Sequence, residues 1–266
     1  TTPISLIPLP KSIAQSDGEF VIGDKLKAMV TPIAEVVFEE FAKEFTTATN
    51  IKIKQVNKSA KAQLELHNLP SIAAEGYKMD ISNQKILIYA SQPAGFFYAL
   101  QTLKQLMPRN VMAGVADPDV TRWTLPCVKI EDEPRFAWRG FMLDEGRHFF
   151  GKEFVKKQID AMALMKLNKL HLHMTNGAGW RIEIEKYPRL TEFAAWRPYR
   201  SWMDWAGDTR YCESNYPTAY GGYYTKADIR EILKYAEARH ITVIPDIEMP
   251  GHSEEVLAAY PELSCS

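Results

Sequence analysis

Three apolar segments of the chain each run directly into charged, amide or imidazole side chains. Apolar strands separated by helices are typical of a parallel sheet, and the carboxyl ends of parallel strands open on one edge of that sheet. The sequence therefore predicts that the side chains following these segments lie close together. The candidate substrate-binding residues at these positions are Arg147, Asn176, Glu248 and His252.

Arg147 and His252 have side chains suited to bind and polarise a hydroxylated ligand. The guanidinium of Arg147 presents a fixed fork of donors, which can bind two neighbouring hydroxyl groups at once. The imidazole of His252 can donate, accept or polarise, and Glu248, four residues earlier, is its expected carboxylate partner. Two simpler interpretations stay open: Arg147 as a surface ion-pair partner, and His252 as a structural residue that fixes the preceding Pro-Gly turn.

His171 and His173 raise the alternative of a zinc site. They are two residues apart on an expected strand, so they point to one face and could contribute two ligands. A zinc site needs further ligands, and His252 is the only obvious candidate for a third. We therefore predict no metal and no cofactor.

Residues 134–266 alternate apolar strands with amphipathic helices, which is typical of βαβ units. The helix expected to follow Thr225 has Asp228 three residues later as a capping pair. The three strands correspond to the first three βα units of a TIM (β/α)8 barrel, which needs eight, so we expect an incomplete barrel and a longer protein. The expected elements are strand 139–144, helix 152–167, strand 168–174, helix 226–239 and strand 241–247.

Residues 1–133 have the pattern of a separate α+β domain, a sandwich-like layer of helices on a sheet. Strand-like runs alternate apolar and polar residues. The helix expected at 93–107 carries an apolar stripe that can cover the sheet, formed by Phe96, Leu100, Leu103 and Met107. Convergent polar groups are missing from this region, so we expect it to support the second domain. The expected strands are 51–53, 63–66 and 85–90, and the expected helices are 32–47 and 93–107.

Composition excludes several classes of protein. The net charge is -1, with no basic block to neutralise phosphates, so no nucleic-acid partner is expected. The chain has no run of 18 apolar residues, so no membrane span is expected. Its 3 cysteines are too few and too scattered for a disulfide framework or a zinc spacing.

Ordered motifs along the whole chain resemble those of the β-N-acetylhexosaminidases of glycoside hydrolase family 20. The resemblance implies an α+β domain followed by a catalytic (β/α)8 barrel, and a glycan substrate with a terminal N-acetylhexosamine. It also gives Arg147 contacts to hydroxyls of the terminal sugar, places His252 in a hydrogen-bonded relay, and gives His171 and His173 a packing role. The motifs are residues 95–103, 134–140, 143–150, 170–173, 179–188, 222–225 and 249–253.

The resemblance implies a substrate-assisted mechanism, in which the 2-acetamido oxygen of the substrate attacks the anomeric carbon with net retention. An adjacent Asp-Glu pair after the fourth strand performs this chemistry in the family, and we expect it downstream of Ser266. Asp144-Glu145 lies at the first strand and Asp132-Glu133 at the domain junction, so neither pair is predicted to be catalytic. No catalytic residue is therefore expected in this chain, which alone should be inactive.

The chain departs from the family pattern after the second barrel strand. Family members carry two aspartates where this chain has Asn176-Gly177, and Asn176 can hydrogen-bond but cannot supply negative charge. Asp246 and Glu248 are also exchanged relative to the usual Glu-x-Asp order. A non-catalytic amino-sugar-binding protein on the same fold therefore stays open as the alternative function.

Aromatic residues near the expected site have two interpretations. Trp180 could form a sugar platform, but packing is favoured because most aromatics in barrels are core residues. An expected loop could shape further subsites, and it contains Tyr199, Trp196, Trp202 and Trp205. The choice between N-acetylglucosamine and N-acetylgalactosamine stays open, as does assembly into a homodimer. The resemblance implies a secreted or periplasmic location.

Overall fold

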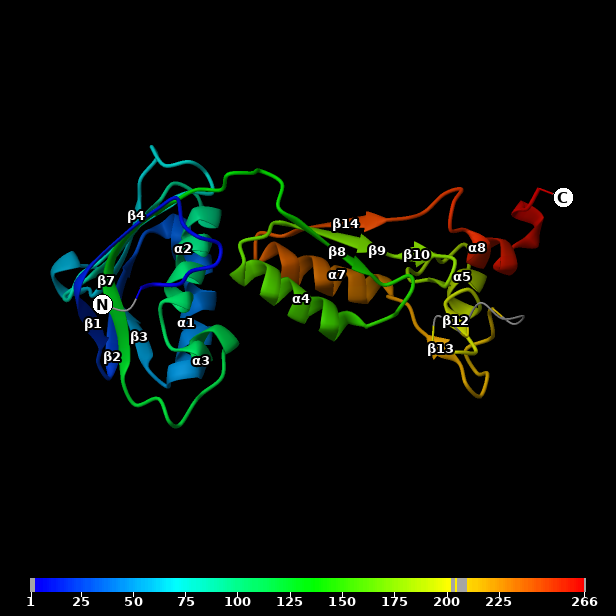
Figure 1. Ribbon diagram of the computed structural model, residues 1–266, viewed down its shortest axis with the longest axis horizontal. Coiled ribbons are helices and arrows are strands. Elements are labelled where there is room, and N and C mark those ends of the chain that lie inside the picture. Colours follow the sequence, from blue (N-terminus) through cyan, green and yellow to red (C-terminus); the bar gives the residue numbers. More distant parts are fainter. Residues whose placement is uncertain (1–2, 202–203, 205–209, 266) are drawn as a thin grey trace. The chain divides into compact units, whose positions relative to one another are not determined.

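The computed structural model describes residues 3–201, 204 and 210–265. The chain divides into two compact units (Figure 1). Unit 1 comprises Thr1–Ala137 with Ala163–Lys166, and unit 2 comprises Trp138–Met162 with Leu167–Ser266. The domain boundary between residues 133 and 134 stays a prediction. Among the described residues, no helix is both long enough and apolar enough to cross a bilayer.

Unit 1 is built on a seven-stranded mixed sheet of order β1-β7-β5-β6-β4-β2-β3. Strands β6, β4, β2 and β3 are parallel neighbours, whereas the pairs β1/β7, β7/β5 and β5/β6 are antiparallel. The strands are β1 (Ser12–Ile22), β2 (Lys25–Val30), β3 (Lys52–Gln55), β4 (Leu64–Asn68), β5 (Tyr77–Ile81), β6 (Ile86–Ala90) and β7 (Trp123–Asp132).

Three helices pack on one face of this sheet (Figure 1), namely α1 (Glu35–Thr49), α2 (Pro93–Gln105) and α3 (Arg109–Ala113). The predicted apolar stripe of the second helix is confirmed, because its members are all buried: Phe96, Leu100, Leu103 and Met107. Two short 3-10 turns, Pro32–Ala34 and Ser59–Lys61, complete the unit. The helices therefore form the second layer over the core.

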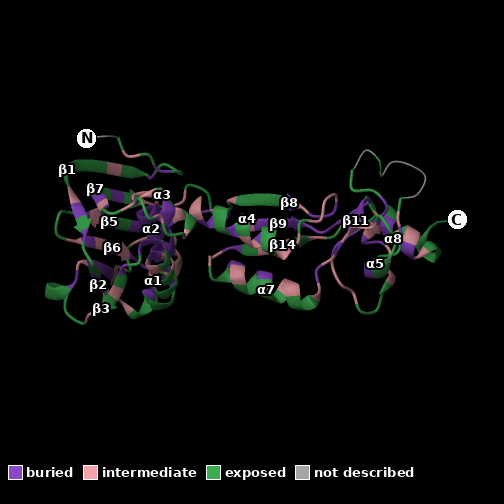
Figure 2. Cartoon of the chain, turned by 90° about the horizontal axis from the view of Figure 1, so that it is seen from below, coloured by how far each residue is buried: buried purple, intermediate pink, exposed green. Residues whose placement is uncertain are grey.

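The three predicted strands are present, but β1, β2, β5 and β7 were missed. Strand β1 is exposed along most of its length (Figure 2), so it lacks the apolar alternation of a half-buried strand. Strand β7 contains Pro126, which lies beside the register shift in β1, and proline argues against a strand in the sequence. In contrast, β5 alternates buried and less buried residues and could have been found by the rule used for the others.

Unit 2 contains a three-stranded parallel sheet of order β14-β9-β8. Its strands are β8 (Gly140–Asp144), β9 (Lys169–His173) and β14 (Thr242–Asp246). Helices α4 (Lys152–Leu164) and α7 (Lys226–Glu237) lie on the same side of the sheet (Figure 1). Buried aliphatic side chains come from both layers, including Val155, Ile159, Leu170, Leu172 and Ile232.

Both predicted helices of unit 2 begin where expected but end earlier, at Leu164 in α4 and at Glu237 in α7. Thr225 and Asp228 form the full capping box at the start of α7, which confirms that prediction. Helix α4 ends at Leu164 and not at residue 167, because Lys166 adopts a left-handed backbone with φ of 58°. Met165, which directly follows α4, is only partly buried.

Cross-strand register places two rows of side chains on the sheet face opposite the helices. Met142, His171 and Ile244 are partners in one row. Asp144, His173 and Asp246 are partners in the next, at the carboxyl ends of the three strands. Polar groups from three segments of the sequence thus meet at one edge of the sheet, as predicted.

The segments that follow these strand ends are short and locally paired. A hairpin, a short helix and a two-stranded antiparallel pair occupy the stretch after β9, and a helix with a 3-10 turn follows β14. These elements are β10 (Thr175–Asn176), β11 (Gly179–Trp180), α5 (Arg189–Glu192), β12 (Trp196–Arg197), β13 (Tyr220–Gly221), α8 (Glu254–Ala259) and the 3-10 turn Pro261–Leu263.

Candidate active site

Asp246 lies at the centre of a hydrogen-bonded array at the carboxyl ends of β9 and β14. Its Oδ2 is 2.8 Å from Nε2 of His171 and 2.7 Å from Nδ1 of His173. The hydrogen bonds from His173 and then from His171 hold the pKa of Asp246 below its usual value, although partial burial opposes them. An ionised Asp246 therefore orients both imidazole rings.

Asn176 fixes the other side of the His173 ring. Its Nδ2 is 3.1 Å from Nε2 of His173, and its own side chain is fully buried. When Nδ1 of His173 donates to Asp246, Nε2 of a neutral ring accepts from the amide of Asn176. Asn176 thus forms a hydrogen bond, as predicted, and its partner is His173. A direct contact of Asn176 with substrate stays a prediction.

Glu248 and His252 lie near each other, as the sequence suggested. Glu248 Oε1 is 3.6 Å from Nδ1 of His252 and 4.0 Å from Nδ1 of His173. The backbone N–H of Glu248 donates to Thr175 Oγ1 at 2.8 Å, which anchors the segment after β14 to the hairpin after β9. The His252 side chain is half exposed, so its imidazole can be reached by a ligand.

Arg147 is placed by Asp144 at the end of β8. Its Nη1 forms an ion pair with Asp144 Oδ2, and its backbone N–H donates to Asp144 Oδ1 at 2.9 Å. The side chain of Arg147 is 42% exposed. One nitrogen of the guanidinium therefore pairs with a carboxylate, and the guanidinium lies at the surface. This geometry is compatible both with binding of ligand hydroxyls and with a surface ion pair.

Arg181 joins several loops of unit 2 through buried hydrogen bonds, a role that the sequence did not indicate. It is fully buried, and its guanidinium donates to the carbonyl oxygens of Glu145, Gly146, Ala178, Ala195 and Gly222 over 2.6–3.3 Å. Burial lowers its pKa to about 10, so it stays charged near neutral pH. Its place in the motif after Trp180 was the available signal, but its partners are far apart in the sequence.

Glu145 is also part of this buried polar region. Its Oε2 accepts from the backbone N–H of Phe150 at 2.9 Å, and burial raises its pKa to about 7. Glu145 is fully buried and Asp144 pairs with Arg147. Both carboxylates of the Asp144-Glu145 dipeptide therefore have partners within the protein.

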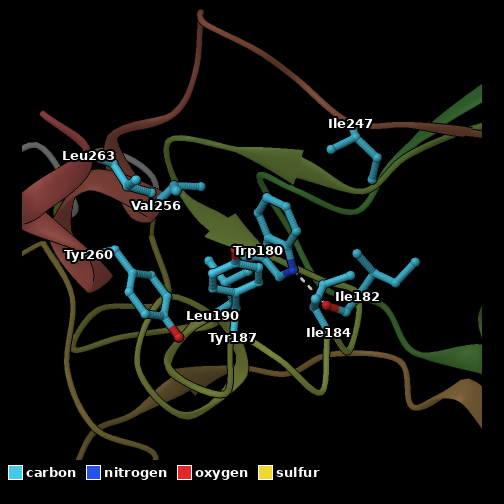
Figure 3. A pocket seen from close by; sticks show the side chains of 9 residues that line it. All are labelled: Trp180, Ile182, Ile184, Tyr187, Leu190, Ile247, Val256, Tyr260 and Leu263. Atoms are coloured by element: carbon cyan, nitrogen blue, oxygen red, sulfur yellow. Dashed lines mark hydrogen bonds between the residues drawn. The ribbon is translucent and has the colours of Figure 1, made fainter.

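An apolar pocket of about 350 Å³ lies beside these elements (Figure 3). Trp180 is buried in it, and its indole N–H donates to the carbonyl of Ile182 at 2.6 Å. A sugar site needs convergent polar groups, so this lining favours packing over sugar binding for Trp180. The lining residues are Trp180, Ile182, Ile184, Tyr187, Leu190, Ile247, Val256, Tyr260 and Leu263.

The aromatic residues proposed for further subsites are only partly described. Tyr199 is exposed, and Trp196 is partly buried with its indole N–H donating to the carbonyl of Thr191 at 2.9 Å. Trp202 and Trp205 lie outside the described residues. The subsite role of this segment stays a prediction.

Two family models match the chain end to end. One, described as "Glycosyl hydrolase family 20, domain 2", matches residues 3–133, and the other, "Glycosyl hydrolase family 20, catalytic domain", matches residues 136–266. The mixed α/β fold is thus that of an N-terminal domain followed by a catalytic-type domain. The chain belongs to glycoside hydrolase family 20.

Individual relatives agree with this assignment. A beta-hexosaminidase of Porphyromonas gingivalis is 38% identical over 98% of this chain and 32% of its own length. An exo beta-N-acetylglucosaminidase of Vibrio harveyi, solved with N-acetylglucosamine, superposes with a TM-score of 0.83 at 32% identity, over 98% of this chain and 38% of that one.

A mutant Streptomyces plicatus beta-hexosaminidase, solved with product GlcNAc, has a TM-score of 0.83 at 36% identity, over 99% of this chain and 50% of that one. The chain therefore spans half or less of the length of each of these three relatives.

Proposed function

We propose that this chain is the supporting domain and the first three βα units of the catalytic barrel of an exo-acting β-N-acetylhexosaminidase. The enzyme removes terminal β-linked N-acetylglucosamine or N-acetylgalactosamine from glycans. The observation that carries the proposal is the catalytic-domain match over residues 136–266, in a unit that gathers arginine, histidine and carboxylate side chains at one sheet edge.

In the proposed mechanism, this chain binds and orients the sugar, and a downstream Asp-Glu pair performs the chemistry. The substrate acetamido oxygen attacks the anomeric carbon, while the glutamate protonates the leaving oxygen and later activates water. Arg147, positioned by Asp144, donates to hydroxyls of the terminal sugar. Glu248 and His252 form the relay beside the acid/base glutamate.

Asn176 alters the charge around His173, which lies beside this relay, in the proposed enzyme. With an amide beside His173, the only carboxylate hydrogen-bonded to the ring is Asp246, among the described residues. A ring with one carboxylate partner is a weaker base than a ring between two. The pH dependence of hydrolysis is therefore expected to differ from that of an Asp-containing relative.

A chromogenic assay on the intact protein tests the proposal. Release of p-nitrophenol from its N-acetyl-β-glucosaminide or galactosaminide, blocked by a thiazoline analogue, is the expected result, and the intact mass of the same sample is measured in parallel. A mass well above 30.3 kDa with no release would reject the hydrolase assignment.

Asn176 in place of the family aspartate favours one second candidate, a non-catalytic amino-sugar-binding protein. Saturable N-acetylglucosamine binding by a longer chain without turnover would support it. For either function, polymeric glycans as ligands favour a secreted or periplasmic location, which fractionation of the source cells would test.

A further inference from the structure

We propose that His171, His173 and Asp246 form a binding site for a divalent transition metal, with zinc as the representative ion. The sequence offered only two histidines and a distant third candidate, His252. Register between β9 and β14 instead pairs His173 with Asp246, whose carboxylate contacts both rings. The three ligand atoms all lie within 4.8 Å of one another.

The donor set matches the preferences of this class of ion. Two imidazole nitrogens and one carboxylate oxygen suit zinc, cobalt or nickel, and three protein ligands leave one position for water. On the sheet face opposite the helices, the side chain of His171 is 44% exposed and that of Asp246 is 29% exposed. The side chain of His173 is only 7% exposed, so His173 lies at the bottom of the site.

Small movements convert the hydrogen-bonded array into a coordination sphere. Bonds of about 2.0–2.1 Å in a tetrahedral site separate ligand atoms by roughly 3.3 Å. The present nitrogen-to-oxygen distances are 2.7 and 2.8 Å, so each ring nitrogen needs to move about half an ångström away from the carboxylate oxygen. Rotation about side-chain torsions supplies such a change without moving the strands.

Proton balance is met within the neutral rings. His173 Nδ1 and His171 Nε2 each give up the hydrogen that they donate to Asp246, and each proton moves, through water, to the other nitrogen of the same ring. His173 Nε2 then donates to the side-chain oxygen of Asn176 after a flip of its amide, whose nitrogen now lies 3.1 Å away. Asn176 thus serves as the hydrogen-bond partner that orients a metal-bound histidine.

Glu248 provides a fourth ligand, and a second oxygen donor, within reach. Its Oε1 is 4.0 Å from the Nδ1 atom of His173, close enough for a rotamer change to bring it to the ion. This ion is not required by the proposed hydrolysis. The bound ion would join side chains from β9 and β14 and so restrain the carboxyl ends of these strands. Its binding would therefore stabilise the folded chain.

Metal titration of the metal-free protein tests the site. Isothermal titration with Zn²⁺ and the visible spectrum with Co²⁺ are expected to show one equivalent bound, with the intense bands of a tetrahedral cobalt site. His171→Gln and Asp246→Asn are each expected to weaken binding at least tenfold. His67→Gln, which alters another histidine beside a carboxylate, is the matched control and should bind as the parent does.

Two outcomes would overturn the proposal. One is the absence of stoichiometric Zn²⁺ binding by the folded parent protein. The other is binding that persists in His171→Gln but disappears in Cys265→Ser, since Cys265 is an exposed thiol that could capture zinc elsewhere. Circular dichroism verifies folding, and if Asp246→Asn does not fold, the half-exposed His171 decides the result.

Discussion

The side-chain amide of Asn176 lies 3.1 Å from Nε2 of His173, on the opposite side of the ring from Asp246. This relationship allows a neutral His173 to satisfy both ring nitrogens, one as donor and one as acceptor. A buried amide thus stands at a position where a carboxylate would add charge to the histidine array.

Asn176→Asp is expected to stabilise the imidazolium form of His173. A carboxylate at this distance favours the charged ring, and burial strengthens the interaction. Ring ¹⁵N chemical shifts at one fixed pH should show a larger imidazolium fraction for His173 in the variant than in the parent. Asn215→Asp, in an exposed turn, is the control; identical His173 ring shifts in the parent and Asn176→Asp would contradict the hydrogen-bonded array.

Arg181→Lys is expected to destabilise the chain by about 3 kcal/mol or more, since an ammonium cannot span the carbonyls that the guanidinium joins. The lost bonds would leave buried carbonyl oxygens without partners. Urea denaturation measures the change. Arg189→Lys, at an exposed ion pair with Glu213, should cost less than about 1 kcal/mol; equal losses in the two variants would refute the special role of Arg181.

Glu255→Gln is expected to flatten the pH dependence of stability. Burial raises the pKa of Glu255 to about 8 from 4.5, although nearby backbone N–H groups oppose it. The folded state therefore holds a proton that the unfolded state releases, so the free energy of unfolding falls as pH rises from about 5 to about 8, by on the order of 1 kcal/mol per unit.

Burial of Glu145, with a pKa raised to about 7, acts in the same direction. Urea denaturation of parent and Glu255→Gln at pH 5, 6.5 and 8 isolates the Glu255 contribution by difference. Glu262→Gln, at an exposed position in the 3-10 turn Pro261–Leu263, is the control. Parallel pH profiles for the parent and Glu255→Gln would show that Glu255 is not the group responsible.

Arg147→Ala is expected to lower kcat/KM of the complete enzyme by about 30-fold or more, because charge-assisted hydrogen bonds to sugar hydroxyls contribute about 2 kcal/mol or more. Folding stability should change by less than about 1 kcal/mol, since the Arg147–Asp144 pair is partly exposed. Steady-state kinetics and urea denaturation measure the two effects. Arg189→Ala removes a comparable surface arginine, and unchanged kinetics in both variants would leave Arg147 as an ion-pair residue only.

Thr225→Ala is expected to destabilise the chain by about 1 kcal/mol, because the hydroxyl caps the N–H of Asp228 at the start of α7. Thermal or urea denaturation gives the value. Ser214→Ala, in an exposed turn, should change stability by less than about 0.5 kcal/mol. A lower free energy of unfolding in Ser214→Ala but not in Thr225→Ala would contradict the capping role.

Local sequence patterns determined the elements that short-range physics can specify. The stripe of Phe96, Leu100 and Leu103 marked α2, and Thr225 with Asp228 marked the start of α7, since both signals lie within a few turns of helix. The ordered motifs also determined the family. These features depend on neighbours along the chain and need no knowledge of what packs against them.

Only the tertiary structure decided which distant groups meet. The β1/β7 pair joins opposite ends of unit 1, and its exposed and proline-containing strands lack a local signature. Register between β9 and β14 selected Asp246, and not His252, as the partner of the two strand histidines. The carbonyl oxygens that accept hydrogen bonds from Arg181 likewise come from four stretches of the chain. Local periodicity does not encode contacts of this kind, because they depend on how distant parts of the backbone are arranged.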